Sequence, residues 1–205
     1  MCINIHYIHT KIKDMTTKKN QFWLILAVLL FLNSNTMAYE KAYLKTEVGK
    51  IQIIDLAPTR IIEAEVDGSY FDSSNGLFSK LFKYISDNDI AMTVPVEGNL
   101  VKAKMRFYIG SEVSSEIKST NAVTVINFSS RTVVSIGGRG AYSEDNINEA
   151  KRDLEDWLKK QSDWSQSGEP YAVYWNGPFT PWFVKRFDVH IPIEKQNVAG
   201  VSQGS

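Results

Sequence analysis

The feature that most constrains this chain is an internal similarity at an offset of 72 residues. Apolar stretches, a Gly-x-Tyr triplet and a helical pattern after it recur in one register in both halves. The matched segments are Ile53–Leu56 with Val125–Phe128, Ile61–Ile62 with Val133–Val134, and Gly68–Tyr70 with Gly140–Tyr142. Several matches in one register indicate a duplicated unit. The fold must therefore accommodate two copies of one strand-and-helix unit.

Each half contains one segment with helical periodicity. The first segment spans 74–86, and its apolar residues are Leu77, Phe78, Leu81, Phe82 and Ile85. The second spans 144–161, and its apolar residues are Ile147, Ala150, Leu154, Trp157 and Leu158. Ser143 is a suitable N-cap for the second helix. Because each set falls on one side of a 3.6-residue helix, we expect both helices to lie against a sheet.

Alternating apolar and polar residues, with many β-branched side chains, predict the strands around these helices. They are expected near 50–56, 59–67, 91–98, 101–110, 122–128, 131–138, 170–176 and 185–193. Neighbouring strands with few helices between them favour antiparallel pairing. We therefore predict an α+β fold in which a duplicated β-β-α-β-β unit forms a distorted antiparallel β-barrel or twisted sheet with two packed helices. A groove between the two units would suit a ligand.

The first 38 residues have the pattern of an export signal. Lys18 and Lys19 precede an apolar run at 22–32, which is shorter than the roughly 20 residues that span a bilayer. The small residues of Thr36–Ala38 fit cleavage after Ala38. We expect 1–38 to be a signal peptide, with Met15 as an alternative start, and the protein to be periplasmic or secreted. The alternative is a membrane anchor formed by uncleaved residues 22–32.

The remaining chain divides into a domain at 39–193 and a polar segment at 194–205, which we expect to be a flexible tail. Removal of 1–38 would shift the net charge from 0 to about −3. It would also remove Cys2 and leave His190 as the sole histidine. Zinc sites and histidine-dependent triads are thereby disfavoured. The chain has no basic stripe, so we expect no nucleic-acid partner.

Two segments stand out within the domain. Pro95 interrupts the strand pattern of 90–96, which predicts an edge strand or a bulge because proline has no N–H to donate. The second segment, 174–183, has two prolines and a glycine and is crowded with aromatic side chains, among them Trp175, Phe179, Trp182 and Phe183. Such a loop either folds onto the core as a plug or contacts a ligand.

Both segments resemble the signature stretches of the SOUL haem-binding family. Residues 91–96 read AMTVPV, close to the family form MTxPV, and residues 176–193 read NGPFTPWFVKRFDVHIPI, close to YxxPxTPxxxRRNEVxIPV. The resemblance covers about 39–193. It implies the duplicated fold that the family shares with the effector-binding domains related to bacterial gyrase-inhibitory proteins.

The resemblance further implies that haem or another porphyrin binds in a shallow apolar cleft beside the first helix. A porphyrin needs an apolar surface, cations for two propionates and, in some proteins, an axial ligand. The candidate contacts are Leu77, Lys80, Leu81, Tyr84, Met92, Trp175, Phe179, Trp182, Phe183, Lys185 and Arg186. Each basic residue has an alternative interpretation as a solvated surface charge.

Axial ligation is the weak part of this interpretation. In strand alternation His190 shares a face with Asp188 and Pro192, so we expect it to face solvent or the open side of the sheet and give it little weight as an iron ligand. Met92 and Met105 are the possible thioether ligands. We therefore expect haem to be held weakly or without axial ligation, in a monomer that contacts a membrane only through the N-terminal segment.

These features leave three functional hypotheses. The first is a haem carrier, buffer or scavenger rather than an enzyme. The second is a binding module for another apolar or cationic ligand, for which Glu63, Glu65 and Glu97 would serve if they point into the groove rather than outward. The third is a small hydrolase with a buried glutamate as general base. Its candidate residues are Glu97, Glu169, Tyr174 and Trp175.

Overall fold

The computed structural model describes residues 42–72, 75–110, 113, 116–177 and 179–196. The strands are β1 (Ile51–Leu56), β2 (Thr59–Glu65), β3 (Val96–Asn99), β4 (Lys104–Tyr108), β5 (Thr124–Phe128), β6 (Arg131–Arg139), β7 (Trp164–Gln166), β8 (Tyr171–Tyr174) and β9 (Arg186–Lys195). The helices are α2 (Leu77–Asp87), α3 (Glu144–Leu158) and the short 3₁₀ helix η1 (Trp182–Val184). The expected signal peptide falls outside these ranges.

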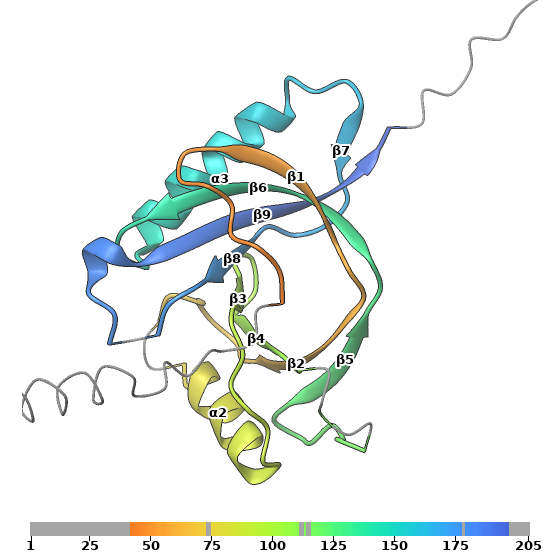
Figure 1. Ribbon diagram of the computed structural model, residues 1–205, viewed down its shortest axis with the longest axis vertical. Coiled ribbons are helices and arrows are strands. Elements are labelled where there is room, and N and C mark those ends of the chain that lie inside the picture. Colours follow the sequence, from red (N-terminus) through yellow and green to blue (C-terminus); the bar gives the residue numbers. More distant parts are fainter. Residues whose placement is uncertain (1–41, 73–74, 111–112, 114–115, 178, 197–205) are drawn as a thin grey trace, which may run out of the picture. The chain divides into compact units, whose positions relative to one another are not determined.

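The strands form one antiparallel sheet that curls into a half-barrel (Figure 1). Their order is β1-β6-β9-β8-β3-β4-β2-β5, and β7 pairs with β9 off this path. The order reads the same from both ends when β1 is exchanged with β5, β2 with β6, β3 with β8 and β4 with β9. This is the symmetry that two copies of one unit would produce. The predicted fold class is thus confirmed.

The two units are joined through their first strands. β1 pairs with β6, and β5 pairs with β2, so each unit lends its first strand to the other. β3 and β8 pair with each other at the centre of the sheet, from Val96 opposite Tyr174 to Asn99 opposite Tyr171. The sheet is therefore continuous across the junction of the units.

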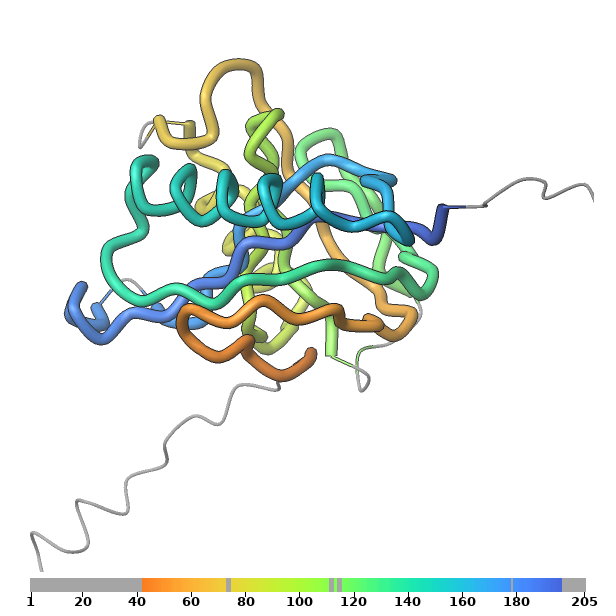
Figure 2. The backbone as a smooth tube through the Cα atoms, turned by 90° about the horizontal axis from the view of Figure 1, so that it is seen from above, coloured from red at the N-terminus to blue at the C-terminus, as the bar shows by residue number. Residues whose placement is uncertain are grey.

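Both helices lie on the same face of the sheet, here called the helix face. α2 packs on β2 and β4, whereas α3 packs on the equivalent strands β6 and β9, as Figure 2 shows for α3. Leu77, Leu81 and Ile85 bury the inner side of α2, and Ile147 and Leu154 that of α3. The Ser143 hydroxyl accepts a hydrogen bond from the Asn146 N–H, which confirms the predicted N-cap. No helix among the described residues is long and apolar enough to cross a membrane.

The opposite face of the sheet, here called the inner face, is largely buried and carries charged side chains beside a small apolar cluster that includes Val133 and Val173. Alternation along β2, β3, β4 and β6 directs charged side chains to this face, where they pair with each other. The series runs Arg131–Glu97–Arg106–Glu63–Lys104–Glu65, with N–O distances of 2.9, 3.6, 2.6, 3.1 and 2.7 Å. Because the charges alternate in sign, each carboxylate of the series faces a cation, which offsets the cost of removing it from water.

The structure differs from the sequence-based expectations at several element ends. Strand β3 begins only at Val96, so the strand predicted near 91–98 starts later than expected, and it lies in the centre of the sheet, so the edge-strand interpretation of 90–96 is wrong. Pro95 precedes the strand, and its missing N–H therefore interrupts no ladder. Helix α2 begins at Leu77 rather than at 74, and helix α3 ends at Leu158 rather than at 161. The short strand β7 had no alternating pattern to predict it. β9 continues to Lys195, two residues into the segment expected to be a tail.

We expect Gly98→Ala to destabilise the protein by about 1–3 kcal/mol, because a methyl group there would overlap the ring of Tyr70, which lies directly on this glycine. The matched control is Gly177→Ala, where an added Cβ meets nothing within 4 Å. Urea unfolding of the three proteins measures the difference. Equal midpoints for Gly98→Ala and Gly177→Ala would contradict the close packing of Tyr70.

Candidate functional site

A large open cleft lies on the helix face, between α2 and the loop that precedes β9. Its volume is about 1140 Å³, which exceeds the roughly 300–1,000 Å³ of typical small-molecule sites. The segments that line it are 70–72, 75–79, 176–177 and 179–181, together with Phe82, Met92, Val94, Val96, Met105, Tyr142, Tyr174 and Lys185. Both units of the duplicated fold thus contribute to the cleft.

Three tyrosines line the part of the cleft where the units meet. Tyr70 and Tyr142 occupy equivalent positions of the 72-residue register, and both contact Tyr174 of β8. The Tyr70 and Tyr174 rings are parallel with centroids 6.2 Å apart, and the Tyr142 and Tyr174 centroids are 4.6 Å apart. Burial raises the pKa of both Tyr70 and Tyr142 to about 12. The hydroxyls therefore remain protonated at neutral pH.

One wall of the cleft is the exposed side of α2. Phe78 and Phe82 lie one turn apart, with centroids 5.8 Å apart, and remain 41% and 49% exposed. Asn75 fixes the start of this helix, because its side-chain oxygen accepts from the Leu77 N–H (3.0 Å) and its amide donates to the Tyr70 carbonyl (2.9 Å). Helical periodicity assigned both phenylalanines to the core. The structure shows that they face the cleft instead.

The other wall is the aromatic loop, defined as residues 176–185. Phe179 is 99% exposed, Trp182 66% and Phe183 58%. These three side chains therefore do not fold onto the core as a plug. Among the aromatic residues named in the sequence analysis, Trp175, which precedes the loop, is the one that is buried in the core. Asn176 anchors the base of the loop by accepting from the Arg186 N–H (2.8 Å), and its own N–H donates to the Tyr142 hydroxyl (2.9 Å).

The cleft contains few charged groups and two sulfur atoms. Lys185 is the one cation among the described lining residues, and its ammonium lies 4.8 Å from the centre of the Tyr142 ring. Met92 and Met105 both line the cleft. No histidine is among the described lining residues, and no cluster of three metal-binding side chains occurs in the described part of the chain.

Of the predicted contacts, Leu77, Met92, Phe179 and Lys185 line the cleft. Trp182 and Phe183 lie on the aromatic loop but outside the lining, and Lys80 is half-buried on α2 and also outside it.

Four other predicted contacts are placed elsewhere. Leu81 is fully buried beneath α2, and the Tyr84 hydroxyl donates to the Lys118 carbonyl. The Trp175 ring nitrogen donates to Asp188, and the Arg186 guanidinium donates to the carbonyls of Gly138 and Thr46. Leu81 and Tyr84 are therefore on the core side of α2. Trp175 and Arg186 form hydrogen bonds within the protein.

The prediction that His190 faces solvent is wrong. The alternation on β9 was read correctly, but the face opposite the apolar residues is the buried inner face, and His190 is 0% exposed. Its Nδ1 lies 3.1 Å from the Tyr171 hydroxyl, and its Nε2 has no partner. Burial, together with the charge of Arg131, lowers the pKa of His190 to about 3. His190 is therefore neutral and remote from the cleft.

The glutamates considered for cation binding or hydrolysis are paired rather than free. Glu63 and Glu97 are buried in the ionic series of the inner face, contrary to the expectation that they point outward. The Tyr108 hydroxyl also donates to Glu97. Glu169 is exposed and accepts from the Asn99 amide at 2.7 Å, whereas Tyr174 is in the cleft on the other face. The proposed hydrolase residues therefore do not form one site.

The sequence matches the family model described as SOUL heme-binding protein over residues 35–192. The chain belongs to the SOUL haem-binding family. The resemblance inferred from its two motifs is thus confirmed, although no curated protein matches the sequence.

Solved structures that resemble this SOUL protein share its fold. The C-terminal domain of EcmrR superposes with a TM-score of 0.58 at 13% identity, covering 72% of this chain and 98% of that chain. An uncharacterised conserved protein from Listeria innocua has a TM-score of 0.52 at 11% identity, covering 72% and 93%. A structure described as a hydrolase from the same organism has a TM-score of 0.50 at 10% identity, covering 74% and 94%. At these identities the likeness concerns the fold alone.

We expect acid to destabilise the protein through His190. The unfolded histidine takes up a proton near pH 6.5, but the buried one does so only near pH 3, so stability present above pH 6.5 is lost as the pH falls through this interval. The free energy of unfolding should fall by about 1.4 kcal/mol per pH unit relative to a His190→Gln variant. Urea unfolding at several pH values measures both proteins. Parallel curves would contradict the burial of a neutral histidine.

Proposed function

We propose that this SOUL protein binds haem or a related tetrapyrrole in the cleft between α2 and the aromatic loop, and that it acts as a carrier, buffer or scavenger. The observation that carries the proposal is the open, aromatic cleft at the junction of the two units. Its volume of about 1140 Å³ and its exposed Phe78 and Phe82 suit a flat apolar guest.

The side chains of the cleft fit the parts of a porphyrin. Phe78 and Phe82 offer an apolar surface on one wall, and Phe179 offers a second on the aromatic loop. The Lys185 ammonium would pair with one propionate. The hydroxyl of Thr180 is a further hydrogen-bonding group in the lining, where a second carboxylate would find a donor.

The donor set favours weak attachment of the iron. Haem iron is held in other proteins by histidine, cysteine, methionine or tyrosine. In this cleft the Met92 and Met105 thioethers are the available soft donors, whereas burial keeps the tyrosine hydroxyls protonated. When bound, the haem would supply iron chemistry, and the chain's own residues would mainly shield and orient the macrocycle. Weak ligation suits a protein that must release its cargo.

We also propose that the protein acts outside the cytoplasm. The apolar run at 22–32, preceded by Lys18 and Lys19 and followed by a cleavage-site pattern at Ala38, supports export. The described lining residues of the cleft include no cysteine or histidine, so porphyrin would bind there mainly through apolar contacts.

Titration of the protein lacking residues 1–38 with haemin should give a saturable one-to-one shift of the Soret band. Phe82→Ala should weaken binding about ten-fold, because it removes part of the apolar wall. Lys185→Ala should weaken it about three-fold, because it removes a partly exposed charge pair. The matched control is Lys83→Ala, since Lys83 is exposed, pairs with Asp87 at 2.8 Å and does not line the cleft. The cleft assignment fails if Phe82→Ala binds haemin as tightly as the unchanged protein.

Haemin and metal-free protoporphyrin should bind with affinities within about ten-fold of each other, because iron ligation adds little. Met92→Leu and Met105→Leu should preserve the apolar volume. Each should change the haemin affinity less than three-fold, which corresponds to about 0.6 kcal/mol of binding free energy. His190→Ala should leave the bound spectrum unaltered, since His190 lies on the other face. Absorption titrations measure all three. A large preference for haemin, lost in one methionine variant, would instead establish a thioether ligand.

A further inference from the structure

The aromatic loop carries exposed apolar side chains that the cleft does not use. Phe179 is 99% exposed, Trp182 66%, Phe183 58% and Val184 43%, and of these four residues Phe179 alone lines the cleft. The Trp182 and Phe183 rings are perpendicular, with centroids 5.8 Å apart, so neither ring covers the other. Apolar side chains that are exposed together mark a surface that meets a partner.

The loop projects from one end of the sheet. Figures 1 and 2 both show the blue segment before β9 extending past the neighbouring strands. The short helix η1 forms its tip, because the Val184 N–H donates to the Pro181 carbonyl (3.1 Å) and the Lys185 N–H to the Trp182 carbonyl (3.3 Å). These bonds hold the exposed side chains of Trp182 and Phe183 on a convex, ordered tip.

Basic residues lie at the base of the loop. Arg139 is opposite Arg186 in the register of β6 with β9, and Lys185 precedes Arg186 in the chain. The segment 176–186 contains no carboxylate, and the next one along the chain, that of Asp188, is fully buried. The loop therefore combines an apolar tip with a positively charged base, as do segments that lie at the surface of a bilayer.

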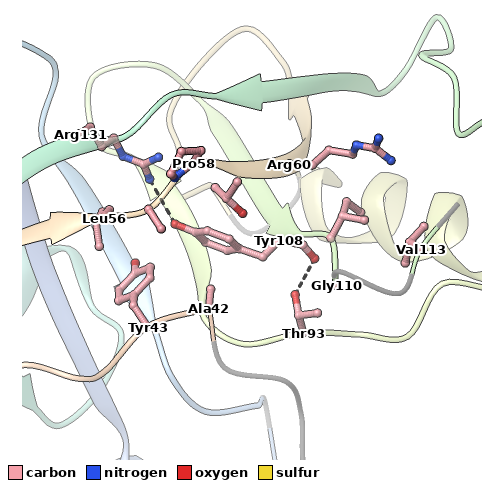
Figure 3. Close-up of a pocket in the computed structure, with 13 residues that line it drawn as sticks. Ala42, Tyr43, Leu56, Pro58, Arg60, Thr93, Tyr108, Gly110, Val113 and Arg131 are labelled. Atoms are coloured by element: carbon pink, nitrogen blue, oxygen red, sulfur yellow. Dashed lines mark hydrogen bonds between the residues drawn. The ribbon is translucent and has the colours of Figure 1, made fainter. Parts of the chain in front are cut away.

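A second cavity of this molecule has no such rim. It lies on the inner face beside the β1–β2 turn, has a volume of about 380 Å³ and is shown in Figure 3. Its walls combine apolar side chains such as Leu56 and Pro58 with hydroxyl groups and arginines. The Thr93 hydroxyl donates to the Tyr108 carbonyl there at 2.6 Å. None of the large apolar side chains that are exposed in the described part of the chain borders this cavity.

We infer that the aromatic loop docks on a lipid surface, with Trp182, Phe183 and Val184 inserted among the lipids and the basic base facing the headgroups. Tryptophan and phenylalanine are the side chains that favour this interface. Because Phe179 and Pro181 of the same loop line the cleft, docking would bring the mouth of the cleft to the bilayer surface. An apolar guest would then enter the cleft from the lipid without crossing water.

A lipid surface fits this tip better than a second copy or another protein does. Stable protein interfaces bury about 800 Å² on each partner. An aromatic side chain offers about 150–250 Å² when it is fully exposed, so the four partly exposed side chains of the tip supply less than that area. A bilayer also surrounds a convex tip on all sides, whereas a protein surface would need a matching hollow.

This inference is independent of the proposed haem binding. It adds a membrane contact to the one expected from the sequence, in which the N-terminal segment alone contacts a membrane. The test therefore uses vesicles without porphyrin and the protein lacking residues 1–38, which contains every described strand and helix but not the apolar run at 22–32. Vesicle binding without haemin binding would support the inference and reject the proposed function.

The probe is a vesicle of phosphatidylcholine with about one quarter phosphatidylglycerol. Co-sedimentation should show saturable binding, at least about five-fold tighter than to pure phosphatidylcholine, because the basic base faces the anionic headgroups. Trp182→Ser should weaken binding about ten-fold and Phe183→Ser about five-fold, because each removes an inserted apolar side chain. The matched control is Val101→Ser, since Val101 is 61% exposed, lies on the β3–β4 turn and does not line the cleft.

The control variant should bind vesicles within about two-fold of the unchanged protein. Urea midpoints verify folding, and Phe183→Ser replaces Trp182→Ser if the latter does not fold. Sedimentation velocity without vesicles tests the second copy as an occupant. The inference is overturned if the protein does not bind vesicles or if both loop variants bind them as tightly as Val101→Ser. It is also overturned if the protein self-associates through a contact that Trp182→Ser abolishes, because the loop would then serve a second copy.

Discussion

The exchange of first strands between the two units is the constraint on which the rest of this structure depends. Because β1 pairs with β6 and β5 pairs with β2, neither unit can complete its own part of the sheet. The central pairing of β3 with β8 then brings the helix faces of both units together. The cleft lies at this junction, and Tyr70 and Tyr142, equivalent in the 72-residue register, meet on Tyr174 for the same reason.

A sheet with two different faces gives the molecule two chemically different cavities. Strand alternation sends apolar side chains to the helix face, whereas the inner face combines charged and hydroxyl-bearing groups with a small apolar cluster that includes Leu56, Val133 and Val173. On the helix face, α2 and α3 cover most of the apolar surface and leave the part beside Phe78 and Phe82 open. On the inner face, the pairing of Glu97 with Arg131 neutralises the charges. The two cavities therefore differ in the chemical character of their walls.

Fold and family could be predicted because they depend on local signals. Periodicity placed both helices, Ser143 was recognised as a cap, and the two proline-containing motifs identified the SOUL family. Individual site residues were harder to predict. Leu81 and Phe82 are adjacent on one apolar helix pattern, yet Leu81 is buried and Phe82 is 49% exposed. Periodicity gives the direction of a side chain around its helix, but the extent of the surface that covers it depends on the neighbouring strands.

By itself, the sequence determined the order of the strand and helix patterns, the antiparallel α+β class and the aromatic character of the loop before β9. Only the tertiary structure decided which side of each element is covered. His190 shows the physical reason, because alternation on β9 correctly separated it from the apolar residues but could not show that the sheet curls over its other face. Burial arises from the packing of segments far apart in the chain, such as Tyr43 against His190. The local sequence pattern shows which side chains alternate between the two faces of a strand. The curvature of the whole sheet determines which of these side chains are exposed to solvent.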